Sequence, residues 1–90
     1  MSVRKAISFI KRQEQVKVII SSRRNVLEEY KREMYDLNDI SINDSENIEI
    51  ICNKKIIEIP VEEINKVVSK STYVVFHEDL RVILFNFISK

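Results

Sequence analysis

The chain is 90 residues long, 44% hydrophobic and 32% charged, which is enough for one globular domain with a modest core. It contains no Gly, and this excludes the Gly-rich phosphate-binding loops of P-loop and dinucleotide-binding enzymes. The net charge of +1 hides an asymmetry, because residues 1–32 hold nine Lys and Arg against three Glu, whereas the remainder is acidic.

The single cysteine, Cys52, excludes a disulfide within the chain and any Cys-based metal site, and its apolar neighbours in "IEIIC" indicate a buried side chain. No apolar stretch approaches the roughly 18 residues of a membrane span. Arg4 and Lys5 interrupt the start, where a signal peptide would be apolar. We therefore expect a cytoplasmic protein with no membrane partner. The abundance of Ile, Asn and Lys is typical of an AT-rich bacterial or viral genome.

Residues 2–37 have the composition of a long helix, without Pro or Gly and rich in Arg, Lys, Glu, Leu and Met. Apolar residues recur at alternating spacings of four and three, which is typical of a coiled-coil seam. This seam predicts self-association through Phe9, Val16, Ile20, Arg23, Leu27, Tyr30 and Met34. Arg23, like Gln13, is a polar exception, and a polar residue at such a position often fixes the register.

A second interpretation of this segment divides it near residues 20–24. The β-branched run "VKVII" has strand propensity, and Ser22 could cap a new helix beginning at Arg23. Arg23 and Arg24 would then meet an anion at a helix N-terminus. The absence of Gly and Pro and the unbroken seam favour one continuous or gently kinked helix.

The cations of this segment predict a second kind of surface. A helix that carries them along one side can lie on the phosphates of DNA or RNA. The tentative nucleic-acid-binding residues are Arg4, Lys5, Lys11, Arg12, Lys17, Arg24 and Lys31. A solvated helix exterior has the same composition, so the pattern alone does not separate the two interpretations.

The second half of the chain changes to a period of two. Residues 38–47, "NDISINDSEN", are typical of a linker. Residues 48–59 predict a β-hairpin that ends at Pro60, with Asn53 able to take a left-handed conformation in the turn. Further strands are expected around Val74 and over residues 80–88, although the latter also present a helical face. The predicted fold class is α+β: a long N-terminal helix followed by a small antiparallel sheet of three to five strands, within one domain over residues 1–90.

Several of these strands are apolar on both sides, for example at Ile51 and Ile56. A sheet of this kind must be covered on both faces, and one helix covers only one. A second copy of the chain is the economical cover for the other, so the sequence predicts a homodimer, or a subunit that docks on a larger protein.

The cluster of His77, Glu78 and Asp79 is the one group of catalytic residue types, and it is best explained as a polar turn between strands. We therefore expect no enzymatic activity, no cofactor and no metal site. The predicted function is a small protein-interaction module (an adaptor, inhibitor or assembly subunit) that self-associates through its helix and apolar sheet. The alternative is a small regulator that binds nucleic acid with the basic face of its N-terminal segment.

Overall fold

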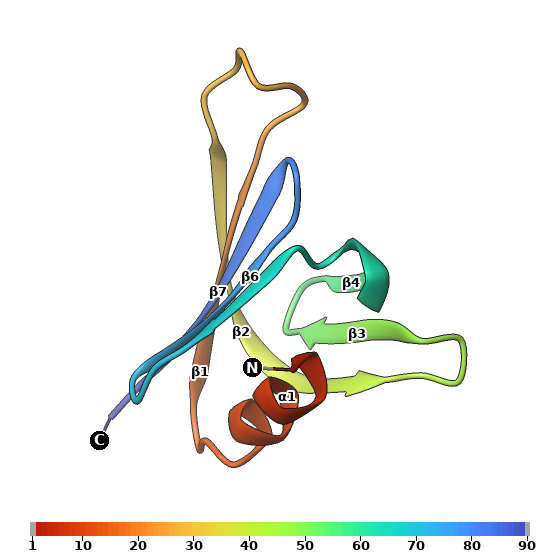
Figure 1. The fold of residues 1–90 in the computed structure, drawn as a ribbon. Coiled ribbons are helices and arrows are strands. Elements are labelled where there is room, and N and C mark those ends of the chain that lie inside the picture. The colour runs from red at the N-terminus through yellow and green to blue at the C-terminus, as the bar shows by residue number, and fades with distance from the viewer. Residues whose placement is uncertain (1, 90) are drawn as a thin grey trace.

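The computed structural model describes residues 2–89, which form one α-helix, one 3-10 turn and seven strands (Figure 1). The strands join in one antiparallel sheet of order β4-β3-β2-β1-β7-β6-β5. The elements are α1 (Val3–Lys11), β1 (Val16–Ser22), β2 (Lys31–Ile42), β3 (Asn47–Cys52), β4 (Ile56–Pro60), η1 (Val61–Glu63), β5 (Lys66–Ser69), β6 (Tyr73–His77) and β7 (Arg81–Phe87).

The predicted α+β fold with a long helix over residues 2–37, and the coiled coil built on it, are wrong. The helix has 9 residues, and the rest of that segment forms β1, a loop and the first half of β2. The reason lies in the β-branched run, where Val16, Val18 and Ile20 are buried in alternation at the centre of the sheet. Helix propensity contributes only tenths of a kcal/mol per residue, and burial in a central strand outweighs it.

The helix α1 is short but well delimited. The Ser2 hydroxyl accepts a hydrogen bond of 3.1 Å from the backbone N–H of Lys5 and caps the first turn. Ala6, Ile7 and Ile10 are buried, and the opposite side of the helix faces solvent. The helix contacts β2 and β5 and lies at one end of the sheet, on the side of the β3–β4 hairpin (Figure 1).

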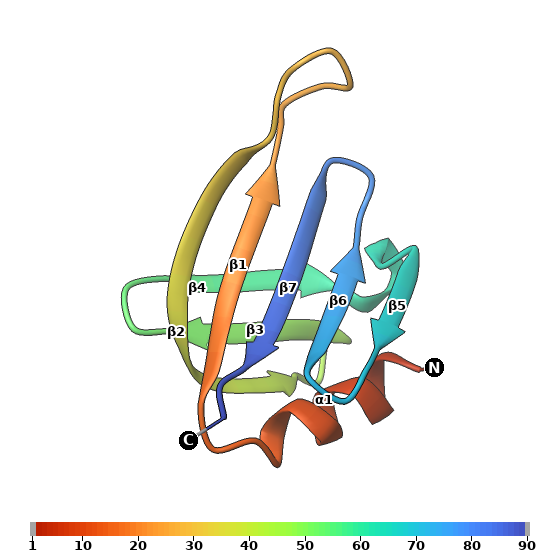
Figure 2. The same ribbon diagram turned by 90° about the vertical axis from the view of Figure 1, so that its left-hand side faces the viewer.

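The predicted linker over residues 38–47 is also wrong, because β2 continues to Ile42. Residues 31–36 of β2 pair with β1, and residues 37–42 pair with β3. Between the two parts, Asn38 is an extra residue that makes the register shift from Leu37–Cys52 to Asp39–Ile51. Figure 2 shows the result: β3 and β4 run across the direction of β1, β7 and β6.

This bulge has a consequence for side-chain direction. Alternate residues of a strand face opposite sides, so Leu37 and Ile40, three positions apart, would normally diverge. The extra residue restores the phase, and both side chains join the core together with Tyr35.

The core is enclosed by α1, by the crossing β3–β4 hairpin and by the inner face of the other strands. The largest fully buried side chains are those of Phe76, Phe85, Ile10, Ile40, Ile48, Ile50, Ile59, Ile83, Val18 and Val74. The Phe76 and Phe85 rings pack edge to face with centroids 5.2 Å apart. The hairpin predicted over residues 48–59 is present as β3 and β4, and β6 and β7 lie where strands were expected.

The turn of the β3–β4 hairpin differs from expectation in one respect. Asn53 does not take the left-handed conformation; its side-chain oxygen accepts instead from the backbone N–H of Asp36 at 3.1 Å. Among residues 2–89, Glu46 is the one residue with positive φ (60°), in the β2–β3 turn. A residue with a Cβ in this conformation is uncommon, and this chain has no Gly to take its place.

Deleting Asn38 should destabilise the protein strongly, because it turns either Leu37 or Ile40 away from the core. The loss of one such buried side chain costs about 2–5 kcal/mol. Chemical denaturation followed by circular dichroism measures the change. The matched control is Asn38→Ala, which keeps the residue count and should leave the midpoint nearly unchanged. A deletion variant as stable as the wild type would contradict this role of the bulge.

Cys52 is 5% exposed, and its burial raises the pKa of its thiol, so the group stays protonated at neutral pH. We expect it to react with Ellman's reagent only when the protein opens. An opening free energy of about 3 kcal/mol slows the reaction about 100-fold relative to the unfolded chain. The control is Lys54→Cys in a Cys52→Ala background, which places the thiol in the exposed turn and should react at once. Equal rates for the two proteins would show that Cys52 is accessible.

Candidate interaction surfaces

An unbroken apolar row crosses the face of the sheet that points away from the core. We call this face, formed by β1, β5, β6, β7 and residues 31–36 of β2, the outer face. The row consists of Met34, Ile19, Leu84, Val75 and Val68, each the register partner of the next. With strands about 4.8 Å apart it is about 19 Å long, and we refer to it as the apolar band.

None of the elements between residues 2 and 89 covers the apolar band. Helix α1 and the β3–β4 hairpin both lie on the other side of the sheet, as Figures 1 and 2 show from two directions. Met34 is 55% exposed, and the other four residues are half-buried by their neighbours in the sheet. Ile19, Leu84 and Val75 also line a shallow hollow of about 270 Å³. A continuous apolar strip open to water is a typical feature of an interface.

The rows on either side of the apolar band are mainly polar and differ in charge. The first runs Arg32, Ser21, Val82, His77 and Lys66 across β2, β1, β7, β6 and β5. The second runs Asp36, Lys17, Asn86 and Tyr73. Lys17 forms an ion pair of 2.5 Å with Asp36, whereas Arg32 makes no ion pair with a residue between 2 and 89. The outer face therefore has an apolar centre and charged edges.

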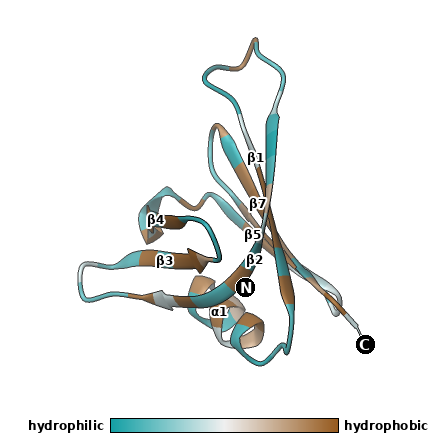
Figure 3. Ribbon diagram, turned by 180° about the vertical axis from the view of Figure 1, so that it is seen from behind, coloured by the Kyte–Doolittle hydropathy of each residue, from teal (hydrophilic) through white to brown (hydrophobic). Residues whose placement is uncertain are grey.

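The loop between β1 and β2, residues 23–30, extends beyond the end of the sheet (Figure 1). Its tip is apolar: Val26 is 69% exposed and Leu27 is 93% exposed, and in Figure 3 the tip is brown within a mostly teal loop. The Asn25 side-chain oxygen accepts a hydrogen bond of 2.9 Å from the backbone N–H of Leu27 and fixes the turn.

The two arginines at the start of this loop have different contacts. The guanidinium of Arg23 lies 4.5 Å from the centre of the Tyr30 ring, a cation–π contact that joins the two sides of the loop. Arg24 forms an ion pair of 3.0 Å with Glu28. No helix begins at Arg23, so the anion site at a helix N-terminus is not formed, and Arg23 supports the loop instead.

The seven residues assigned to the coiled-coil seam do not share a surface. Val16 and Ile20 are in the core, and Phe9 is half-buried with its ring 5.4 Å from that of Phe87. Arg23, Leu27 and Tyr30 lie in the β1–β2 loop, and Met34 begins the apolar band. The predicted coiled-coil seam is therefore wrong, because these residues do not line one helix face. Sequence reasoning missed the apolar band that Met34 joins, because Val68, Val75 and Leu84 come from strands 34 to 50 positions further along the chain.

A basic groove lies between the exposed side of α1 and the β5–β6 turn, with a volume of about 620 Å³. It is lined by Arg4, Lys5, Ser8, Phe9, Arg12, Ser69, Lys70 and Ser71, and no carboxylate is among these residues. Three of the seven predicted nucleic-acid-binding residues therefore meet here. Lys70 was not predicted to join them, because only the position of β5 beside α1 brings it near.

The other four predicted basic residues lie elsewhere. Three form ion pairs along the chain: Lys11 with Asp39 at 3.9 Å, Lys17 with Asp36 at 2.5 Å and Arg24 with Glu28 at 3.0 Å. Lys31 is the first residue of β2, at the base of the loop. The continuous basic ridge of the predicted helix is thus divided into a groove at one end of the molecule and scattered, mostly paired cations.

His77 ends β6, and Glu78 and Asp79 form the turn to β7, as the sequence predicted. Glu78 accepts two hydrogen bonds from Arg81, and this raises the pKa of the Arg81 guanidinium. His77 lies on the outer face, whereas Cys52 is in the core. Within residues 2–89, no three His, Cys, Asp or Glu side chains are arranged to hold a metal ion.

The nine-residue α1 is the one α-helix between residues 2 and 89, and no helix in this range is long and apolar enough to cross a membrane. Comparisons with known proteins find no matching family model, and no curated protein or solved structure that matches this chain significantly.

Proposed function

We propose that this chain is a small non-enzymatic interaction protein that forms a homodimer through the apolar band of its outer face. The observation that carries the proposal is the band itself: five apolar residues in direct register across five strands, on a face that none of the described elements covers. Two sheets packed face to face lie about 10 Å apart, close enough for such side chains to interdigitate.

The band is not a by-product of a generally apolar strand composition. Isolated apolar residues are normal on protein surfaces, but contiguous strips are rare on monomers. In the two rows beside the apolar band, the same strands carry charged or titratable residues: Arg32, His77, Lys66, Lys17 and Asp36. Polar and charged residues therefore predominate in these two rows, where Val82 is the one aliphatic residue, as in an interface with an apolar core and a polar rim.

Charge supports a second copy of this chain as the partner. Consider two copies packed face to face about a two-fold axis that runs along the apolar band. The row that begins with Arg32 in each copy then lies over the row that begins with Asp36 in the other. Arg32 of one copy then faces Asp36 of its partner, and the same contact recurs on the other side of the axis. Ser21 and Val82 face the partner copy's Lys17 and Asn86, so no like charges meet at these positions.

The Arg32 and Asp36 contact would fix the orientation of the dimer more than its affinity. Asp36 already accepts from Lys17, and a carboxylate has acceptor sites for a second cation. The guanidinium of Arg32 has no such partner between residues 2 and 89. Charge pairs at the edge of an interface mainly contribute specificity, whereas the apolar centre contributes the binding energy.

Leu84→Glu should dissociate the dimer without unfolding the subunit, because the side chain points away from the core at the middle of the band. An unpaired charge buried in an interface costs about 3–5 kcal/mol, so the dissociation constant should rise more than about 100-fold. Sedimentation velocity over a concentration series measures this, with circular dichroism to check the fold. The matched control is Ile56→Glu on β4, an apolar residue that is 67% exposed but lies outside the outer face; its dimer should persist.

Charge exchange tests the two-fold arrangement itself. Arg32→Asp alone should weaken the dimer, and combining it with Asp36→Arg should restore most of the loss if these residues face each other across the interface. A wild-type chain that sediments as a monomer at every concentration would overturn the homodimer. An Ile56→Glu effect as large as that of Leu84→Glu would place the interface elsewhere.

A further inference from the structure

The basic groove lies apart from the apolar band, on the solvent side of α1. Around its opening stand Lys5, Arg12 and Lys70, none of which forms an ion pair with another residue between 2 and 89. The hydroxyls of Ser8, Ser69 and Ser71 add donors between the cations. Positive charges and hydroxyl donors, with no Asp or Glu among the lining residues, are the surroundings that a row of phosphates requires.

We propose that this groove binds the phosphodiester backbone of nucleic acid, and that the Glu46 carboxylate occupies the place of one phosphate when the groove is empty. The proposal does not depend on the homodimer. It rests on the meeting of α1 with the β5–β6 turn, which gathers cations that are up to 66 positions apart in the chain.

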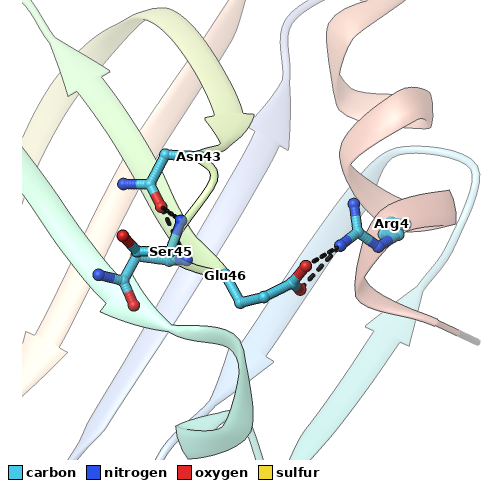
Figure 4. Close-up of polar contacts among 5 residues, drawn as sticks. Arg4, Asn43, Ser45 and Glu46 are labelled. Carbon is cyan, nitrogen blue, oxygen red and sulfur yellow. Dashed lines mark hydrogen bonds and ion pairs between the residues drawn. The ribbon is translucent and has the colours of Figure 1, made fainter.

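The arrangement of Glu46 carries the second part of the proposal. Arg4 donates two hydrogen bonds from its Nη2 to the Glu46 carboxylate, at 2.8 and 2.7 Å (Figure 4). An arginine bound to a carboxylate in this way makes the contact that it would make to a phosphate. Glu46 reaches this position from a backbone φ of 60°, which is uncommon for a residue with a Cβ.

The turn holds Glu46 in this conformation. The Asn43 side-chain oxygen accepts from the backbone N–H groups of Ser45 and Asn47 at 3.0 and 3.1 Å, which closes the turn around Glu46 (Figure 4). The side chains of Arg4 and Glu46 are 64% and 67% exposed, so their ion pair contributes only about 0–1 kcal/mol. A phosphate can therefore replace the carboxylate at little cost.

Two observations favour nucleic acid over an anionic membrane as the polyanion. The cations surround a hollow, whereas a flat lipid surface contacts projecting residues. The apolar tip that could enter a membrane, formed by Val26 and Leu27, lies at the opposite end of the molecule from α1 (Figure 1). One membrane surface cannot contact both.

Fluorescence anisotropy with labelled oligonucleotides tests the proposal, with single-stranded RNA, single-stranded DNA and duplex DNA as separate arms. Between about 50 and 200 mM salt, three phosphate contacts predict a slope of about −2 for log K against log [salt] with a single strand, and about −3 with a duplex. The three arms therefore identify which form of the shared phosphodiester chemistry the groove prefers.

Three variants locate the site. Lys70→Glu should weaken binding at least about fivefold at about 0.1 M salt, because one phosphate contact is lost. Lys54→Glu makes the same charge change in the β3–β4 turn, away from the groove, and should have a smaller effect. Glu46→Gln should tighten binding about fivefold and steepen the slope by about 0.7 with a single strand, because Arg4 becomes free to contact a further phosphate.

The proposal has distinct ways to fail. No binding to any oligonucleotide at low salt would overturn it, as would equal effects of Lys70→Glu and Lys54→Glu. Binding of polyglutamate or of phosphatidylserine vesicles as tight as that of oligonucleotides would reject the assignment to nucleic acid. An unchanged affinity in Glu46→Gln would remove the role of Glu46. The Leu84→Glu variant should keep its groove intact, so a failed dimer does not count against this site.

Discussion

Strand β2 pairs with β1 in its first half and with the crossing strand β3 in its second half. The extra residue Asn38 allows the apolar side chains of both halves to join one core. Without it, the half of β2 that pairs with β1 and the half that pairs with β3 would present their apolar side chains to opposite faces. With it, Tyr35, Leu37 and Ile40 all join the core. The crossing of β3 and β4 over the other strands, and the space that α1 fills, both follow from this bend.

The same geometry determines which surfaces stay open. The β3–β4 hairpin and a nine-residue helix lie on one side of the sheet, and no element formed by residues 2–89 lies on the other. The outer face therefore keeps the apolar band in contact with water, while α1, packed through its apolar side, turns its cations toward the β5–β6 turn. The two candidate surfaces are consequences of one arrangement, although they suit different partners: one a matching apolar face, the other a polyanion.

The sequence predicted the second half of the chain much better than the first. In β3 and β4 the alternation of Ile with polar residues has only one explanation, so the hairpin was found. In residues 16–37 the apolar positions fit both a heptad and a strand, and Lys, Arg, Glu and Met favoured the helix locally. Pairing with β7, 59 to 71 positions away, decided between them, and no local pattern contains that information. The basic groove was predicted only in part for the same reason. The sequence identified the cations in and next to α1, but only the fold brings Lys70 beside them.

The central position of β1 also sets the order in which the protein can fold. One edge of β1 finds β2 through a short loop, but the other edge must wait for β7, which follows the other six strands along the chain. Until then β1 presents an unpaired edge and a row of apolar side chains, and closing so long a loop is slow. The β7 segment of a neighbouring chain can fill the same gap during this interval. Exchange of β7 between nascent chains is therefore the misfolding route to which this topology is most exposed.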